Sequence, residues 1–237
     1  MDALLVERGL AADINEARAL ILAGKVLSGD TLLSRAAEGL DPLVPLRVRG
    51  RKAFVSRAGL KLDAALSLGG IAVSGLRCLD LGASTGGFTD CLLRRGAATV
   101  LSVDVGRNQL AWELRCDPRV DSREGLDYRD LRECDIPRPL GFVCADLAFT
   151  SAMPLFPLLA CWLEKGAAWV LLVKPQFEAA AFEVGPGGVL RDEAVRRRVL
   201  DKALSTADAA GLPAGGHAES PVPGAKGNRE WLLWGRR

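Results

Sequence analysis

Residues 79–90 read LDLGASTGGFTD, and this stretch decides the fold. Leu79 and Leu81 flank Asp80 at the end of an apolar run, and three glycines follow within the next six residues. A strand that passes through a glycine-rich loop into a helix lies at the carboxyl edge of a parallel sheet, where open α/β folds bind ligands. The stretch therefore predicts a ligand site around the loop 82–87.

Beyond residue 57 the chain alternates short apolar runs with helical segments. We expect strands in RCLDLG, TVLSVDVG, RVDSREGL, GFVCADLAF, AWVLLVKP and REWLLWG, and helices over 57–68, in FTDCLLRRG, before Lys165 and over 192–210. Continuously apolar strands alternating with helices indicate a parallel sheet covered on both faces. The pattern predicts an α/β, Rossmann-like domain.

The beginning of the chain has a different pattern. Two short helices are expected, over 2–8 and 15–23, each followed by a glycine, and a turn-rich strand region comes next. We expect a small α+β domain over 1–49, a linker over 50–56 and the main domain over 57–237.

Charge is concentrated near the start of the chain. The formal net charge is only +2, yet residues 47–61 hold six Lys or Arg and no acid. Such a local patch fits a polyanion better than the summed charge suggests. The six cysteines form no C-x-x-C pair, and no apolar run is long enough to span a bilayer, so we expect reduced, buried thiols in a soluble, cytoplasmic protein.

Three kinds of site use a loop like 82–87. A dinucleotide fold would need a glycine where Ser84 stands. The segment 82–86 also matches the G-x-S-x-G elbow of hydrolases, with Asp146 and His217 following in hydrolase order, but the upstream oxyanion glycines are missing. S-adenosylmethionine has no pyrophosphate and requires only that Asp80 and the glycines let it lie against the strand end, which this loop fits better.

Two acids follow later strands. Asp104 ends the next strand, where a carboxylate can accept both hydroxyls of an adenosine ribose. Asp127, in LDYRDL, is a candidate for the adenine amino group and equally for an ordinary turn acid. Asp146 and Lys174 each end an apolar strand at the same sheet edge, and Glu230 precedes a strand of opposite expected direction. The three charges are therefore expected to meet.

The chain resembles the TlyA group of rRNA 2′-O-methyltransferases, historically also labelled haemolysins. The segments that carry the resemblance are LLVERGLAADINEARALILAGKV, which is similar to an S4 RNA-binding module, followed by SRAGLKLDAAL, LDLGASTGGFTDCLL, VCADLAF, LLVKPQFE and KGNREWLLW. The resemblance implies a class I S-adenosylmethionine-dependent, FtsJ-like methyltransferase domain after an S4 domain. The Lys-Asp-Lys-Glu tetrad of that group falls on Lys61, Asp146, Lys174 and Glu230.

The resemblance also implies roles. The cofactor would contact Asp80, Gly82, Ala83, Ser84, Thr85, Gly86, Gly87, Asp104, Asp127 and Asp146. The reaction would be an in-line attack of a ribose oxygen on the sulfonium methyl, without a metal. Lys174 is the candidate base, because neighbouring Lys61 and partial burial favour its neutral amine, while Asp146 and Glu230 orient the lysines and the hydroxyl.

Ribosomal RNA or a ribosomal subunit is the expected partner. Its phosphates would meet Arg18, Lys25, Arg47, Arg49, Arg51, Lys52 and Arg57. The chain has Asp13-Ile14 where S4 modules commonly carry Ser-Arg, which removes one phosphate contact. Its length resembles the shorter subgroup, which modifies a cytidine of 23S rRNA. A non-catalytic rRNA-binding or assembly factor, and a hydrolase that uses Ser84, are the alternatives.

Overall fold

The computed structural model describes residues 1–7, 10–11, 13–28, 31–35, 46–50 and 53–237. It divides into two compact units, 1–52 and 53–237, and the division falls within the segment 50–56 expected to be the linker. The expectations for Arg51 and Lys52 lie outside the described residues.

The first unit packs two helices against a small sheet. Helices α1 (Asp2–Glu7) and α2 (Ile14–Leu22) agree with the two expected from sequence. Strands β1 (Val26–Ser28), β2 (Thr31–Leu32) and β3 (Arg47–Val48) form a sheet in the order β2-β1-β3. Asp13 caps α2, accepting a hydrogen bond from the Glu16 amide at 2.8 Å, which gives a structural reason for an acid there.

The second unit is built on a seven-stranded sheet in the order β6-β5-β4-β7-β8-β10-β9. Its strands are β4 (Arg77–Leu81), β5 (Thr99–Asp104), β6 (Val120–Glu124), β7 (Phe142–Ala145), β8 (Ala168–Val173), β9 (Ala214–Glu219) and β10 (Trp231–Arg236). The strands β6, β5, β4, β7 and β8 pair in parallel with one another in that order. Strand β10 runs antiparallel to both β8 and β9. The mostly parallel α/β sheet confirms the predicted fold class.

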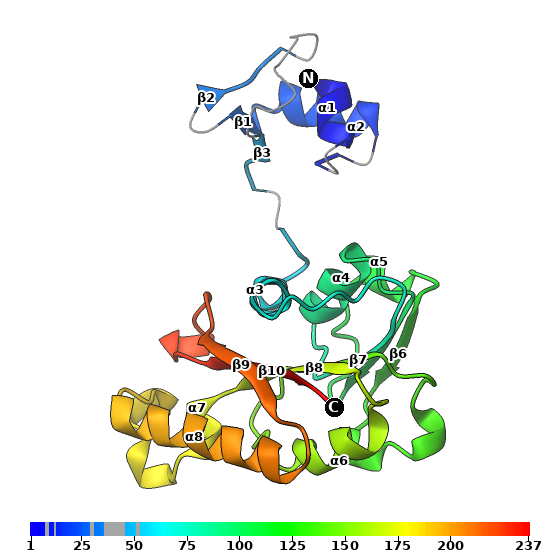
Figure 1. Ribbon diagram of the computed structural model, residues 1–237. Helices are drawn as coiled ribbons and strands as arrows, with labels where there is room; N and C mark the ends of the chain where they lie inside the picture. The colour runs from blue at the N-terminus through cyan, green and yellow to red at the C-terminus, as the bar shows by residue number, and fades with distance from the viewer. Residues whose placement is uncertain (8–9, 12, 29–30, 36–45, 51–52) are drawn as a thin grey trace. The chain divides into compact units, whose positions relative to one another are not determined.

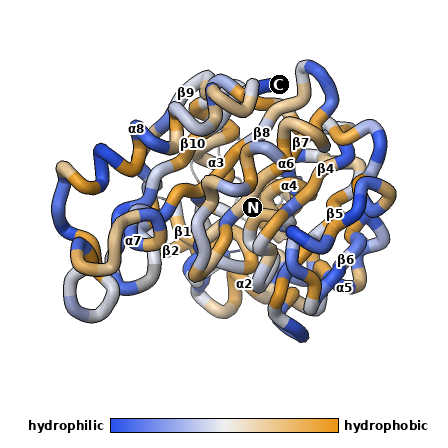
Figure 2. Tube along the Cα trace, turned by 90° about the horizontal axis from the view of Figure 1, so that it is seen from below, coloured by the Kyte–Doolittle hydropathy of each residue, from blue (hydrophilic) through white to orange (hydrophobic). Residues whose placement is uncertain are grey.

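Helices cover both faces of this sheet (Figure 1). One face carries α3 (Ala58–Leu68), α4 (Gly87–Arg94) and the short α5 (Trp112–Arg115), and the other carries α6 (Leu155–Trp162) and α8 (Glu193–Ala209). Hydrophilic and hydrophobic residues alternate along α8, as expected for a helix with one face on the core (Figure 2). Short helices fill the connections: α7 (Pro175–Glu178) and the 3₁₀ turns Tyr128–Asp130, Glu133–Asp135, Ala181–Glu183, Pro186–Gly188 and Ala225–Gly227.

The cysteines are divided between the interior and the surface of the protein. Cys78, Cys91 and Cys144 are buried free thiols, but Cys116, Cys134 and Cys161 are exposed, so the prediction of six buried thiols was wrong. The exposed three lie at the end of α5, in a 3₁₀ turn and on the outer side of α6, not in strands. No helix in the described ranges has both the length and the apolar character that a membrane span requires.

Candidate active site

Gly82 brings the ends of β4 and β7 together. Its φ is +80°, and a Cβ at this position would lie 2.6 Å from the carbonyl oxygen of Asp146. Any side chain would therefore push the two strand ends apart. Gly82 and Asp146, both expected to contact the cofactor, line the same cavities, and this glycine permits their direct backbone contact.

Gly86 and Gly87 are needed for a different reason from the one expected. A Cβ on Gly86, whose φ is +93°, would lie 2.2 Å from the Leu114 side chain, and one on Gly87 would lie 2.2 Å from the Ser56 hydroxyl. Both glycines thus let the loop pack against the protein. Neither lines the cavities described below, so the structure does not place them against a ligand.

A cavity of about 610 Å³ opens at the carboxyl ends of β4, β5 and β7. Its walls include Gly82, Ser84, Asp104, Gln109, Asp127, Asp146 and Phe149. Asp104 joins two of its loops, because its carboxylate accepts hydrogen bonds from the amides of Ser84 at 2.8 Å and Gly106 at 2.6 Å. A carboxylate has about four acceptor sites, so Asp104 keeps capacity for a ligand.

Asp80 stands behind this cavity and not in its wall. Its side chain is fully buried and accepts a hydrogen bond from the Thr89 hydroxyl at 2.7 Å. Burial raises the pKa of Asp80 to about 7, although the Thr89 hydrogen bond opposes the shift. In this structure Asp80 supports the loop through Thr89 in α4 and lines neither cavity.

Asp127 behaves as a turn acid in this structure. Its carboxylate caps the 3₁₀ turn that follows and binds the Arg129 guanidinium through both oxygens, at 2.9 and 2.6 Å. The hydrogen bonds from Arg129 lower the pKa of Asp127. Asp127 still lines the cavity, but its acceptor sites are largely engaged.

A second cavity of about 180 Å³ adjoins the first. It is lined by Ser56, Ala58, Gly82, Ala83, Ser84, Thr85, Phe88, Asp146, Ala148 and Lys174. Gly82, Ser84, Asp146 and Ala148 belong to both cavities. Asp146 therefore stands at the border between the large cavity and the small one, which Lys174 also lines.

The four tetrad residues form two ion pairs. Lys174 Nζ lies 2.5 Å from Asp146 Oδ1, in a contact of charges that is not an aligned hydrogen bond. Lys61 Nζ donates a hydrogen bond to Glu230 Oε2 at 2.6 Å, and these side chains are only 9% and 2% exposed. The tetrad divides into a partly open pair beside the cavities and a buried pair.

Strand register explains why the two pairs lie on the same face of the sheet. Trp231 of β10 pairs with Val173 of β8, so Glu230 comes opposite Lys174 just beyond the ladder. Side chains alternate along a strand. Val173 and Trp231 pack with the helices α6 and α8, which leaves Lys174 and Glu230 on the other face, where α3 carries Lys61.

Phe149 was missed by sequence reasoning. Its φ is +59°, which is unusual for an aromatic residue, and its side chain is 90% exposed at the wall of the larger cavity. The ring centroids of Phe149 and Phe177 lie 5.6 Å apart. Lys174 Nζ lies over the Phe177 ring, 6.0 Å from its centroid. The strained backbone holds an aromatic ring in solvent beside the site, and nothing in the residue pattern predicts that exposure.

The hydrolase interpretation fails on topology. His217 lies on β9 and Ser84 follows β4, with β7, β8 and β10 between these strands. Four strand spacings separate them by about 19 Å. The Ser84 hydroxyl instead donates to Gln109 Oε1 at 3.1 Å. A Ser84–His217 pair therefore cannot form.

The expected RNA contacts are distributed over both units. Arg18, Lys25, Arg49 and Arg57 are all exposed, and Arg18 also pairs with Asp2 at 2.8 Å. The Arg47 side chain lies outside the description, as do Arg51 and Lys52.

Comparison with known proteins decides between the remaining interpretations of the glycine loop. Residues 54–237 match the family described as FtsJ-like methyltransferase. The chain belongs to this family. Its methyltransferase unit is the described 53–237, and the dehydrogenase interpretation is excluded.

Relatives extend the similarity over nearly the whole chain. The 16S/23S rRNA (cytidine-2′-O)-methyltransferase TlyA of Mycobacterium tuberculosis is 44% identical, with 99% of this chain and 88% of the relative covered. Hemolysin A of Brachyspira hyodysenteriae is 37% identical, with 98% and 97% covered. The resemblance to the TlyA group is confirmed.

Solved structures give the same result. A hemolysin candidate from Streptococcus thermophilus matches with a TM-score of 0.75 and 37% identity, covering 100% of this chain and 87% of that one. Fibrillarin from Aeropyrum pernix, solved with natively bound S-adenosyl-L-methionine, matches with a TM-score of 0.52 at 16% identity, covering 75% of each chain. The latter likeness concerns the fold alone.

Proposed function

We propose that this methyltransferase transfers a methyl group from S-adenosylmethionine to the 2′-hydroxyl of a cytidine in ribosomal RNA. One observation carries the proposal: Asp146 and Lys174 line a small cavity that shares walls with a larger one at the same sheet edge. A methyl donor and an acceptor hydroxyl need two such adjoining sites.

The larger cavity fits the proposed cofactor. Its volume of about 610 Å³ is in the range for small-molecule sites, and its walls combine apolar surface with Asp104 and loop backbone. Asp104 would accept the ribose hydroxyls, and Gly82 would allow close approach to the strand end. S-adenosylmethionine supplies a methyl group on a sulfonium sulfur when it is bound. Membership of the FtsJ-like methyltransferase family supports this choice.

Lys174 would take the proton of the acceptor hydroxyl. A 2′-hydroxyl is a weak nucleophile and needs a base within hydrogen-bond reach. Lys174 lines the smaller cavity, and its amine would accept that proton. The ammonium that forms is then held by Asp146, 2.5 Å away in this structure.

Lys61 and Glu230 would support the reacting pair without touching the substrate. They line neither cavity, and each is almost fully buried. Their hydrogen bond joins α3 to the start of β10, opposite Lys174. We therefore assign the base and its partner to Lys174 and Asp146, and the framework to Lys61 and Glu230.

Phe149 supplies a surface for the target base. Aromatic side chains bind unstacked bases by stacking, and single-stranded RNA is recognised largely in this way. The Phe149 ring is exposed and lines the larger cavity. Asp146 lines this cavity too, and it also lines the smaller cavity proposed for the acceptor. A cytosine turned out of its stack would lie on this ring while its ribose enters the smaller cavity.

The S4-like unit and the basic run are proposed to bind the rRNA backbone in the cytoplasm. Lys25, Arg49 and Arg57 provide exposed cations for phosphates. Two rRNAs remain candidates: the 44% identical relative is named for 16S and 23S rRNA, and a Campylobacter jejuni relative named for 23S rRNA alone is 32% identical over 76% of this chain and 70% of its own.

Methyl transfer and cofactor binding should be measured together. The wild type should incorporate labelled methyl into unmodified rRNA, and Lys174→Ala should reduce incorporation by roughly 10²-fold or more while calorimetry gives an unchanged affinity for S-adenosylmethionine. Lys165→Ala is the control, because Lys165 is exposed at the opposite sheet edge, before β8. Tight rRNA binding by a wild type that transfers no methyl would instead support an assembly factor.

A further inference from the structure

Arg196 is a buried arginine on the apolar face of α8. That face otherwise consists of Val195, Val199, Leu200, Ala203 and Ala207, and Arg196 is only 1% exposed among them. Removing a guanidinium from water is costly, and hydrophobic residues often replace buried ion pairs without loss of stability. Its presence on this face therefore needs a reason other than packing.

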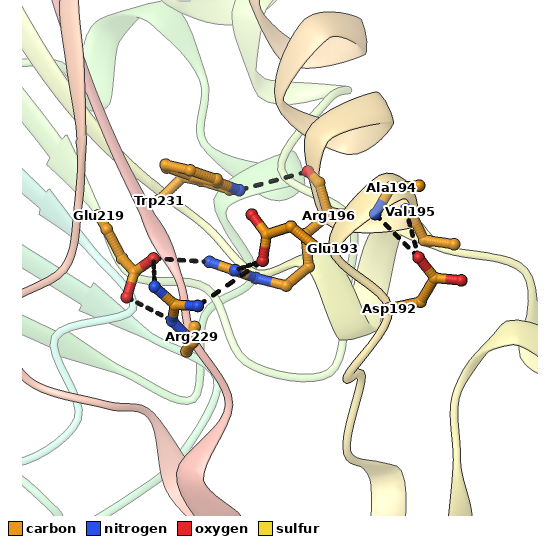
Figure 3. A network of polar contacts seen from close by, with 8 residues as sticks. All are labelled: Asp192, Glu193, Ala194, Val195, Arg196, Glu219, Arg229 and Trp231. Atoms are coloured by element: carbon orange, nitrogen blue, oxygen red, sulfur yellow. Dashed lines mark hydrogen bonds and ion pairs between the residues drawn. The ribbon is translucent and has the colours of Figure 1, made fainter.

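The guanidinium connects three elements (Figure 3). It binds Glu193 in the first turn of α8, and its Nη2 lies 2.9 Å from Glu219 Oε2 at the end of β9. It also lies 5.1 Å from the ring centroid of Trp231, the first residue of β10. The Arg196 carbonyl oxygen accepts a hydrogen bond from Trp231 Nε1 at 3.3 Å.

A second arginine completes the network. Arg229 Nη2 lies 2.5 Å from Glu219 Oε2, and its Nε donates to Glu219 Oε1 at 2.6 Å. Glu219 therefore binds both arginines (Figure 3). Contacts with Glu219 and Arg196 thus hold Arg229 and Trp231, the residues on either side of Glu230.

Glu230 itself points to the other face of the sheet. Trp231 packs on the α8 side, whereas the Glu230 carboxylate receives the Lys61 hydrogen bond from α3 at 2.6 Å. Its backbone carbonyl accepts from the Ser220 amide at 2.8 Å. The α8 network and the Lys61–Glu230 pair thus hold one strand start from opposite faces.

We propose that Arg196 is a positioning residue for the methyl transfer. It acts through Trp231 and the Glu219–Arg229 pair to set where Glu230 stands, and hence where Lys61 and the start of β10 lie beside Lys174. This inference rests on the proposed function. Displacing a reacting group by about 1 Å can cost on the order of 10²-fold in rate, so a remote clamp can matter to catalysis.

The test compares two arginines of α8. Arg196→Met keeps an unbranched apolar side chain and removes the guanidinium and its charge, and Arg198→Met is its matched control, because Arg198 makes an exposed ion pair with Glu183. We expect Arg196→Met to lower kcat roughly tenfold, with KM for rRNA and the affinity for S-adenosylmethionine within about twofold of wild type. Arg198→Met should leave all three unchanged.

Two further variants guard against a loss of folding. Trp231→Phe removes the hydrogen bond to the Arg196 carbonyl and keeps a ring, so kcat should fall by a smaller factor. Arg196→Lys keeps one charge but not the forked geometry and should recover part of the Arg196→Met loss. A wild-type kcat in Arg196→Met, or a loss in which cofactor affinity falls equally, would overturn the proposal. A wild type without methyl transfer would overturn the proposed function instead.

Discussion

At the scale of single residues, the site depends on close backbone contact. Gly82 has a positive φ, and the carbonyl oxygen of Asp146 occupies the place of its missing side chain. Gly166 has a similar φ of +85° with nothing within 4 Å of its hypothetical Cβ. Substitutions at these two glycines therefore distinguish the energetic cost of a positive φ, which both share, from the cost of a steric clash, which only Gly82 has.

Gly82→Ala should therefore destabilise more than Gly166→Ala. Both variants place an L side chain at positive φ, at a cost of about 1 kcal/mol. Only Gly82→Ala also pushes β4 from β7, so it should lose roughly 1–3 kcal/mol more in urea unfolding and at least tenfold in affinity for S-adenosylmethionine. Equal losses in the two variants would show that the contact with Asp146 is unimportant.

Asp80 should make stability depend on pH. Burial raises its folded pKa to about 7 from an ordinary value of 3.8, so the folded state binds a proton that the unfolded state has released between these values. The contribution of Asp80 to stability therefore falls as pH rises from about 4 to about 7. Asp80→Asn keeps an acceptor for Thr89 and cannot ionise. Its free energy of unfolding in urea, relative to that of the wild type, should therefore increase as pH rises from 5 to 8. A difference that stays constant with pH would contradict this account.

Residue roles were the least predictable from sequence. The tetrad positions came from the family resemblance, and the position of Asp104 after its strand correctly indicated the cavity wall. The structural roles of Asp80, Gly86 and Gly87 depend on which side chains pack around them. The sequence of the loop alone does not specify those neighbours. Phe149 could not be anticipated, because exposure and positive φ are properties of the folded chain.

At the scale of elements, hydrophobic pattern was a good guide. The apolar runs predicted the strands β4, β5, β7, β8 and β10, which are buried on both faces. Short elements such as α5 and α7 were missed, because four residues show no period. The sequence indicated that Glu230 and Lys174 share a sheet edge, but the register that places them opposite each other follows only from the pairing of β10 with β8.

The Lys61–Glu230 pair should couple α3 to β10 in stability. Glu230→Leu leaves a buried ammonium without a partner and should cost about 3–5 kcal/mol in urea unfolding. The double variant Lys61→Met, Glu230→Leu removes both charges and should recover most of that loss while methyl transfer stays low. If the double variant were as unstable as the single one, the pair would not be the source of the cost.

At the scale of the whole molecule, each of the two units has a core of its own. The clusters of buried apolar residues that pack both faces of the large sheet belong to 53–237, and the small unit has its own cluster around Leu5, Ala17 and Ile21. The concentration of cations over 47–61 was visible in the sequence.

The fragment 53–237 should fold and bind S-adenosylmethionine within about threefold of the full chain. It should bind rRNA more weakly, with a shallower dependence of log affinity on log salt, because the cations of the first unit no longer release counterions. Calorimetry for the cofactor and filter binding across salt concentrations measure both. Undiminished rRNA affinity in the fragment would remove the proposed role of the first unit.

The central claim is methyl transfer to a ribose, and mapping 2′-O-methyl groups tests it most directly. Unmodified 16S and 23S rRNA and ribosomal subunits should be incubated with S-adenosylmethionine and either the wild type or Lys174→Ala. We predict a new 2′-O-methyl mark on a cytidine with the wild type and its absence with the variant. Methylation on a base, or an equal ribose mark with Lys174→Ala, would contradict the account.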